Sequence, residues 1–322
     1  MITSCPHSLY FFRVDVEHLN MDEAVNTFKD WHIVPLGRPT ISPPQQKLQV
    51  LDIPGTNGVM DLSNSLTKYP VFQNRTGTMK FAVDYDATDW LTAYTQILKF
   101  LQGVDVRMIL EDDPIFFYEG RVFVENFDPR NDGTWTELTL GYDLYPYRKS
   151  IYTSIDDDWL WDPFNFETDV IQSSVFSAIQ VEATGFITVT PTGGAGQDPS
   201  ALGWYEKVFG GGYIPTTDTT VDPTKTYYEQ SDWNEFDFTG FIDCEPVIPK
   251  ITVNTDDNQP MLAQLLNTDI YGNTWKNFSL PETSQPYQVY DLLFCEMTPE
   301  SKVKMRFKNP GTINLEFRSG RL

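Results

Sequence analysis

The sequence predicts a mainly β protein with one helix, and three observations lead to this fold class. The 22 prolines and 20 glycines are spread along the chain, which favours many short strands joined by turns over a helix bundle. Apolar residues alternate in most patterned segments and recur at helical spacing in only one. The length of 322 residues exceeds the size at which one core stops growing, about 250–300 residues, so we expect two domains, 1–150 and 151–322.

Residues 31–85 carry most of the local signals. Prolines fix φ and remove donors, which excludes a helix in the first part: Pro35, Pro39, Pro43 and Pro44. Residues 47–53 then alternate as a strand does and end at Ile53. The dipeptides Pro54-Gly55 and Asn57-Gly58 follow, and Asn-Gly favours a tight hairpin turn with positive φ. The pattern predicts a β meander held by turns.

The end of this segment is predicted as strand, turn and strand. Residues 71–72 end one strand, Asn74-Arg75-Thr76-Gly77 has the composition of a turn, and residues 79–83 form the next strand. Asn74-Arg75-Thr76 also matches a glycosylation acceptor, but a hairpin turn is the better interpretation because no secretory signal is evident.

Residues 86–103 form the one predicted helix. Its apolar residues recur at three- and four-residue spacing and make one stripe: Trp90, Leu91, Tyr94, Ile97, Leu98 and Leu101. Asp86 or Thr88 caps the first amides, and Gly103 takes the left-handed position at the C-terminus. We expect this helix to lie across one face of the meander.

Further strands complete both domains. In the first domain they are expected at residues 9–16, 104–110, 116–127 and 135–145, with a break at 111–114. In the second domain two are expected within 173–190 and others at 247–253, 287–295, 302–307 and 312–317. Short strands with regular turn signals predict a β-sandwich for the second domain.

The formal net charge of −22 argues against a protein that reads duplex DNA or RNA, since such proteins carry a basic patch. A charged surface that keeps the chain soluble is the simplest interpretation, and an acidic surface that nucleic acid passes without sticking is the alternative. No signal peptide is evident, and no apolar run approaches the roughly 18 residues of a membrane span, so we expect a soluble protein made in the cytoplasm.

The residues offer little for catalysis, a metal or a cofactor. The three histidines, His7, His18 and His32, lie far from any nucleophile motif. The acidic clusters at residues 111–113 and 156–158 lack the spacing of a calcium loop and are interpreted as solvated turns. The three cysteines, Cys5, Cys244 and Cys295, have neither disulfide nor zinc spacing and are interpreted as buried free thiols. We therefore expect no catalytic residue, no metal site and no cofactor.

Motifs between residues 28 and 150 resemble those of one known family. The matching residues are Ile53-Pro54-Gly55, Gly58, Asp61-Leu62, Leu66-Thr67, Tyr69, Asn74-Arg75-Thr76-Gly77, Asp112-Asp113-Pro114, Tyr118-Glu119-Gly120-Arg121 and Tyr145-Pro146-Tyr147. In this order, around one amphipathic helix, they resemble the distal tail proteins of long-tailed, siphovirus-type phages and prophages of Gram-positive hosts. Residues 311–322 resemble the family's C-terminal strand, and residues 159–166 do so less specifically. Residues 185–245 match nothing in the family and are predicted to be an insertion.

The resemblance implies a fold and a role. The fold would be an N-terminal belt domain, a β-barrel or meander with one helix and a projecting hairpin, followed by a galectin-like β-sandwich. The role would be structural: a homo-hexameric ring at the distal end of the virion tail that connects the tail tube to the tail-tip hub or tail-associated lysin protein of the baseplate. Genomic DNA would pass through the ring without specific binding, and a receptor-binding protein would be a further partner in host attachment.

Within this role, the special residues of the belt are expected to shape the backbone at subunit contacts. They are Pro39, Pro43, Pro44, Ile53, Pro54, Gly55, Gly58, Asn74, Arg75, Thr76 and Gly77. The segment 35–44 is expected to reach a neighbouring subunit. The alternative function is a module that binds host cell-wall polysaccharide through the C-terminal domain, with exposed rings as candidate glycan contacts: Trp204, Tyr205, Tyr213, Tyr227 and Tyr228.

Overall fold

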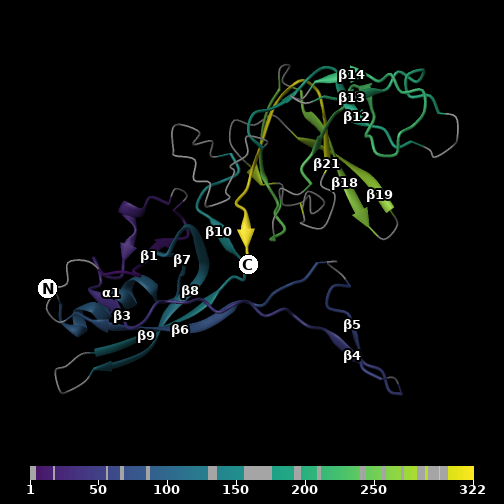
Figure 1. The fold of residues 1–322 in the computed structure, drawn as a ribbon. Helices are drawn as coiled ribbons and strands as arrows, with labels where there is room; N and C mark the ends of the chain where they lie inside the picture. The colour runs from purple at the N-terminus through teal and green to yellow at the C-terminus, as the bar shows by residue number, and fades with distance from the viewer. Residues whose placement is uncertain are drawn as a thin grey trace. The chain divides into compact units, whose positions relative to one another are not determined.

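The chain forms two compact units, residues 1–152 with 318–322 and residues 153–317 (Figure 1). The computed structural model describes residues 5–16, 19–55, 57–65, 69–84, 88–129, 136–155, 176–191, 197–208, 212–239, 242, 244–255, 259–269, 272–280, 287–288, 297 and 304–322. The last five residues belong to the first unit, where Gly320 and Arg321 pair with Lys149 and Arg148. The chain therefore enters the second unit after Tyr152 and leaves it at Arg318.

The first unit is built on a nine-stranded antiparallel sheet. Its main path runs β2-β1-β7-β8-β9-β6-β3, and β10 pairs with both β8 and β23. The strands are β1 Leu9–Arg13, β2 Val25–Asn26, β3 Ile33–Pro35, β6 Arg75–Val83, β7 Asp105–Leu110, β8 Asp113–Pro129, β9 Thr136–Leu144, β10 Arg148–Ser150 and β23 Gly320–Arg321. A short 3-10 helix, η1 Met21–Glu23, precedes β2. A separate two-stranded hairpin, β4 Val50–Asp52 and β5 Val59–Asp61, leaves this sheet between β3 and β6.

One helix, α1 Trp90–Leu101, shares a core with the sheet. Its buried residues, Ala93, Ile97 and Leu101, are spaced by four and pack in one cluster with strand residues such as Phe81 and Leu138. The helix begins at Asp89, whose carboxylate accepts hydrogen bonds from the amides of Leu91 and Thr92. Such a cap satisfies two of the first amides, which have no partner within the helix.

The predicted helix was right in place but wrong in detail. Thr88 is not the capping residue, and Asp86 lies outside the described residues. Trp90 and Leu91 were expected in the buried stripe but are exposed, because the cluster begins one turn later, at Ala93. The expected left-handed Gly103 is confirmed by its φ of +73°.

Asn74-Arg75-Thr76-Gly77 is not a turn, which corrects the prediction. Strand β6 begins at Arg75, and its pairing with β9 already includes Arg75↔Leu144 and Gly77↔Tyr142. The glycine has a packing reason instead. A Cβ at Gly77 would lie 2.4 Å from the hydroxyl oxygen of Tyr142, whose ring crosses the strand there.

The second unit contains two four-stranded sheets that share one core, and this two-layer arrangement is the predicted β-sandwich. The first sheet has the order β11-β22-β17-β20, with β11 Ile179–Val181, β17 Lys250–Thr255, β20 Tyr287–Gln288 and β22 Gly311–Glu316. The second has the order β16-β21-β18-β19, with β16 Asn234–Asp237, β18 Met261–Asp269, β19 Gly272–Leu280 and β21 Lys304–Lys308. Alternate residues of both sheets, such as Val253 and Ile313 in one and Leu265 and Phe307 in the other, form the core.

The segment predicted as an insertion, 185–245, forms a third sheet and then rejoins the sandwich. Its order is β12-β15-β13-β14, with β12 Gly185–Thr188, β13 Tyr205–Lys207, β14 Tyr213–Pro215 and β15 Tyr228–Ser231. The following strand, β16, belongs to the sandwich itself. Of the strand expected at 287–295, the structure describes only β20, at Tyr287–Gln288. Residues 156–166 lie outside the described residues.

Candidate functional site

The hairpin between β3 and β6 is the most unusual part of the first unit, and we call it the arm, residues 45–73. It starts as a narrow ladder: the amide of Gln73 donates to the carbonyl of Gln45 at 2.7 Å, and the amide of Lys47 donates to the carbonyl of Val71 at 2.7 Å. It continues into β4 and β5, which pair as Val50↔Asp61, Leu51↔Met60 and Asp52↔Val59. Figure 1 shows β4 and β5 projecting away from the nine-stranded sheet.

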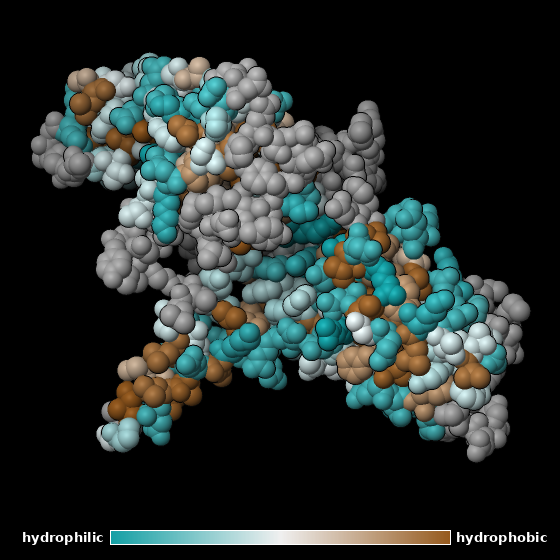
Figure 2. All heavy atoms as spheres, turned by 180° about the vertical axis from the view of Figure 1, so that it is seen from behind, coloured by the Kyte–Doolittle hydropathy of each residue, from teal (hydrophilic) through white to brown (hydrophobic). Residues whose placement is uncertain are grey.

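The arm exposes apolar side chains on both of its faces. Five of the fifteen large hydrophobic residues that the described chain exposes lie here: Leu48 67%, Val50 52%, Leu51 50%, Val59 58% and Met60 49%. Leu51 and Met60 are direct cross-strand partners, so they share one face of the ribbon, and Val50 and Val59 lie on the other. Figure 2 shows the arm as a largely hydrophobic projection at the lower left.

Such a ribbon needs a partner, for a physical reason. An isolated two-stranded hairpin is marginally stable in water, because it has no second layer against which to bury its side chains. Exposed apolar surface gathered in one place marks an interaction site more often than scattered single residues do. The arm therefore has the composition of a docking element.

The base of the arm is clamped to the sheet at Ser42. The Tyr142 hydroxyl accepts a hydrogen bond from the Ser42 amide at 3.0 Å and donates to its Oγ at 3.2 Å. The Arg75 guanidinium donates to the Ser42 carbonyl at 3.1 Å and to the Pro146 carbonyl at 2.7 Å. Arg75 is buried, which lowers its pKa, and it lies 5.5 Å from the centre of the Tyr118 ring. Gly77 leaves room for the Tyr142 ring that reaches Ser42.

The structure thus brings part of the predicted belt motif together at this clamp. Arg75 and Gly77 act on the base of the arm of the same chain, and Asn74 donates a hydrogen bond to Asp143 at 2.8 Å on the neighbouring strand. The predicted turn residues Pro54, Gly55 and Gly58 lie at the tip, directly after Ile53. The positive φ expected at Asn57-Gly58 is confirmed at +80° for Gly58, and Gly55 also has a positive φ, of +89°.

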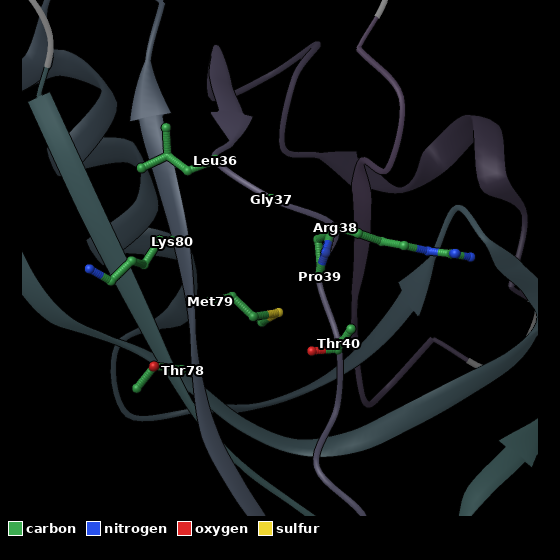
Figure 3. Close-up of a pocket in the computed structure, with 8 residues that line it drawn as sticks. All are labelled: Leu36, Gly37, Arg38, Pro39, Thr40, Thr78, Met79 and Lys80. Atoms are coloured by element: carbon green, nitrogen blue, oxygen red, sulfur yellow. The ribbon is translucent and has the colours of Figure 1, made fainter.

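The proline-rich segment that leads to the arm lies along the sheet of the same chain. The Leu36 amide donates to the Lys80 carbonyl at 2.9 Å, and the segment is held again at Ser42. Between these two points it runs apart from β6 and lines one side of an open pocket of about 280 Å³. Figure 3 shows the pocket, which residues 36–40 and 78–80 line, with Met79 pointing toward Pro39 and Thr40. Pro39 is buried, and Pro43 is exposed beside the clamp.

The acidic turn beside this segment ties several elements together. Asp112 binds His7 at 2.8 Å and the Arg38 guanidinium at 3.0 Å, and the hydrogen bond from His7 is the main reason that its pKa is lowered. Glu111 accepts a hydrogen bond from the Ser8 amide at 2.8 Å. Among the described residues, no group of three His, Cys, Asp or Glu side chains is arranged to hold a metal ion. These carboxylates fix the N-terminal segment and the turn.

Two of the five candidate glycan contacts are wrong, because they are buried. Trp204 is 7% exposed and Tyr227 is 1% exposed, and their rings pack on each other at 5.5 Å. The Tyr227 hydroxyl donates to Asp218 at 2.6 Å and accepts from the Asp222 amide at 3.0 Å. A covering loop that begins after β14 supplies both partners, so these rings stabilise the third sheet from within.

The other three candidates are half-buried and pack on one another. Tyr213 stacks on Phe186 at 4.1 Å, and the Lys207 ammonium lies 5.9 Å from the centre of the Tyr213 ring. Tyr205 meets the edge of Phe186 at 5.1 Å, and Tyr228 meets Tyr213 at 5.0 Å. A sugar needs a free ring face, and the Tyr213 face is already occupied. The face of the third sheet is a small aromatic core.

Glu235 joins the third sheet to the sandwich. Its carboxylate accepts a hydrogen bond from the Thr188 hydroxyl at 2.5 Å and pairs with Arg306 at 2.7 Å and Lys304 at 3.1 Å. Burial by itself raises the pKa of Glu235, but the hydrogen bonds from Thr188 and Arg306 and the two positive charges offset this, so that the pKa is lowered. Arg306 also lies 3.9 Å from the centre of the Trp275 ring. Glu235, Lys304 and Arg306 have a structural role, since each of these charged side chains has a partner of opposite charge.

The chain was compared with known proteins. No protein-family model matches it, and no curated protein matches it. Among solved structures it is similar to the SPP1 Dit (gp 19.1) protein, described as a paradigm of the hub adsorption apparatus in Gram-positive infecting phages, at 13% identity and a TM-score of 0.44, over 90% of this chain and 94% of that chain. It is also similar to a chain of the phage P2 baseplate in its activated conformation with Ca, at 9% identity and a TM-score of 0.34, over 97% of each chain. The first of these is a Dit protein, the family that the motifs of residues 28–150 resemble.

The sequence pointed to the arm but not to its exposure. The signal was present in the adjacent apolar residues Val50-Leu51 and Val59-Met60, because neighbouring residues in a strand face opposite sides. A two-stranded hairpin that stands apart from any second layer leaves the apolar residues of both faces exposed. Among the described residues, no helix is long and apolar enough to cross a membrane.

Proposed function

We propose that the protein is a structural component of the tail tip of a siphovirus-type phage, in which six copies form a ring. The ring connects the tail tube to the tip hub and surrounds the channel through which DNA leaves. The single observation that carries this proposal is the apolar arm, exposed on both faces and clamped at its base. A base held by hydrogen bonds and an uncovered apolar ribbon beyond it are suited to crossing from one subunit to the next.

The remaining features agree with a scaffold. Buried polar side chains of the first unit bind backbone groups and fix their positions, as the Arg75 guanidinium does for the carbonyls of Ser42 and Pro146. The net charge of −22 suits a surface that DNA passes, because acidic groups near a channel repel phosphates. A ring with a basic lumen would contradict this part of the proposal.

The test is the oligomeric state of the purified chain and of an arm variant. We expect the protein to form rings of six copies by light scattering and electron microscopy. The double variant Leu51→Asp/Met60→Asp places charges on one face of the arm, and we expect it to be a folded monomer. The matched control is Leu262→Asp, because Leu262 is a comparably exposed residue, at 39%, on β18 of the sandwich.

Two outcomes would contradict the proposal. A protein that stays monomeric at high concentration cannot be a self-assembling ring. An arm variant that assembles as well as the Leu262→Asp control would show that the arm does not hold copies together.

A further inference from the structure

The tip of the arm holds the only Asn-Gly dipeptide in the sequence, Asn57-Gly58. Asparagine is a chemically labile residue, and a following glycine favours the loss of its side-chain amide as ammonia. The backbone nitrogen of the following residue attacks the side-chain carbonyl carbon, and glycine hinders this attack least because it has no Cβ. The reaction needs access to water, an attacking amide without a hydrogen-bond partner, and room for the ring that forms.

Asn57 meets each of these conditions. Asn57 and Gly58 are both exposed, so water reaches them. Within the described part of the chain, neither the Asn57 side chain nor the Gly58 amide takes part in a hydrogen bond. A Cβ at Gly58 would meet nothing within 4 Å, so the space beside the attacking nitrogen is open. The positive φ of Gly58, +80°, is one that residues with a side chain rarely adopt.

The second asparagine of the arm lacks one of these conditions. Asn64 is also exposed and is followed by a small residue, Ser65. The Ser65 amide, however, donates a hydrogen bond to the Leu62 carbonyl at 3.0 Å, and the Asn64 side chain accepts one from Gln46 at 3.4 Å. The Ser65 amide must leave its partner before it can attack. Asn64 is therefore an internal control in the same hairpin.

We propose that Asn57 is a self-modification site, at which the chain converts its own asparagine to an acidic residue. The Gly58 nitrogen forms a bond to Cγ of Asn57, and the Asn57 amide nitrogen leaves as ammonia with the proton from Gly58. A succinimide ring remains. A water molecule then opens the ring at either of its carbonyl groups, which gives aspartate or isoaspartate at position 57. No oxidant, metal or cofactor takes part, and the modification goes beyond the ring proposed above.

Both products change the tip of the arm. Each adds a negative charge to a loop that already begins beside Asp52, at the end of β4. Isoaspartate also lengthens the backbone by one carbon atom, because the chain then runs through the former side chain. Strand β5 begins at Val59, directly after Gly58, and Val59 pairs with Asp52. Since loop length fixes the register of a hairpin, the longer loop loosens this first pair of the ladder.

The test is incubation of the intact protein, followed by peptide mass spectrometry in which fragmentation separates position 57 from position 64. We expect the Asn57 peptide to gain the mass of an amide-to-carboxylate change and to split into aspartate and isoaspartate forms on chromatography. The attacking amide must lose its proton, so the rate should rise about tenfold from pH 7 to pH 8. Asn57→Gln should abolish the change at position 57, and the matched control Asn64→Gln should leave it intact.

The urea-denatured chain gives the reference rate for each asparagine. We expect folding to slow Asn57 by less than about tenfold and Asn64 by more than that, because only the Ser65 amide is held. Slowing of Asn57 by more than about tenfold, or equal slowing of the two residues, would overturn the proposal.

Hydrogen exchange of the aged protein tests the effect on the arm. Peptides that cover β4 and β5 should exchange faster in aged wild type than in Asn57→Gln aged in parallel, and peptides that cover β6 should be unchanged. Equal exchange of β4 and β5 in the two proteins would refute the loosening of the ladder. These readouts concern one residue and its hairpin, so their failure is distinct from a failure of the ring, which the oligomeric state reports.

Discussion

Replacing Gly77 with alanine tests whether the clamp at Ser42 holds the arm. The added methyl group would lie 2.4 Å from the Tyr142 hydroxyl oxygen and 2.7 Å from Cζ of the same ring. Carbon and oxygen atoms do not approach this closely, so the Tyr142 ring must move away from β6. Its hydroxyl then leaves Ser42, to which it makes hydrogen bonds of 3.0 and 3.2 Å.

The magnitude follows from these contacts. Overpacking of this kind costs about 1–3 kcal/mol, and each of the two lost hydrogen bonds is worth about 1 kcal/mol. We expect a total loss of about 3–5 kcal/mol in the stability of the first unit, or about 2–4 kcal/mol if the ring keeps one bond to Ser42. The amide of Ser42 should then exchange its hydrogen at least about tenfold faster, since about 1.4 kcal/mol corresponds to a factor of ten.

Hydrogen exchange followed by mass spectrometry measures this directly, on peptides that cover residues 36–49. The matched control is Gly37→Ala in the same segment, where a Cβ meets nothing within 4 Å and the change should stay within about 0.5 kcal/mol. Tyr142→Phe removes the same hydrogen bonds without a clash and should show about 1–2 kcal/mol of the loss. If Gly77→Ala exchanges like Gly37→Ala, the Tyr142 ring does not need the space above Gly77 and the clamp is not what holds Ser42.

Two further predictions concern other parts of the molecule. Glu235→Gln should destabilise the second unit by about 3 kcal/mol, the low end for breaking a buried pair, because Lys304 and Arg306 keep some contact with water. The pKa of Glu235 is lowered in the folded state, so its contribution is complete above the ordinary value of 4.5 and is lost as the pH falls through the lowered folded pKa. Denaturant titrations should therefore show a larger difference between wild type and variant at pH 7 than at pH 3. Asp89→Ala should speed hydrogen exchange of the first amides of α1 and leave the hydrogen exchange of β6 unchanged. Unchanged hydrogen exchange in both elements would mean that the Asp89 cap does not stabilise the start of α1.

The fold class was predictable because it depends on local patterns. Alternation, proline and glycine spacing report which faces of a segment are apolar, and this was enough for the sheet, the single helix and the sandwich. The failures came from residues whose role depends on distant partners. Gly77 has the composition of a turn, but Tyr142, 65 positions later, makes it a strand residue that must lack a side chain.

The aromatic residues of the third sheet show the same limit. Tyrosine and tryptophan occur both in sugar sites and in cores, so composition could not separate Tyr227 from an exposed ring. Burial was decided by Asp218 and Asp222, which bring a loop over the Tyr227 hydroxyl. The sequence also did not show which apolar residues would stay exposed. Leu51 lies in an alternating segment like a buried strand leucine, and only the structure shows that its side chain is exposed.

The sequence by itself determined the mainly β class, the position of the helix and the turn at the tip of the arm, because each follows from the spacing and conformational limits of neighbouring residues. The tertiary structure alone decided that Arg75 and Tyr142 clamp Ser42, that the arm stays uncovered and that a pocket lies between residues 36–40 and β6. These features depend on which residues meet across long sequence separations, and pairing of that kind is set by packing in three dimensions.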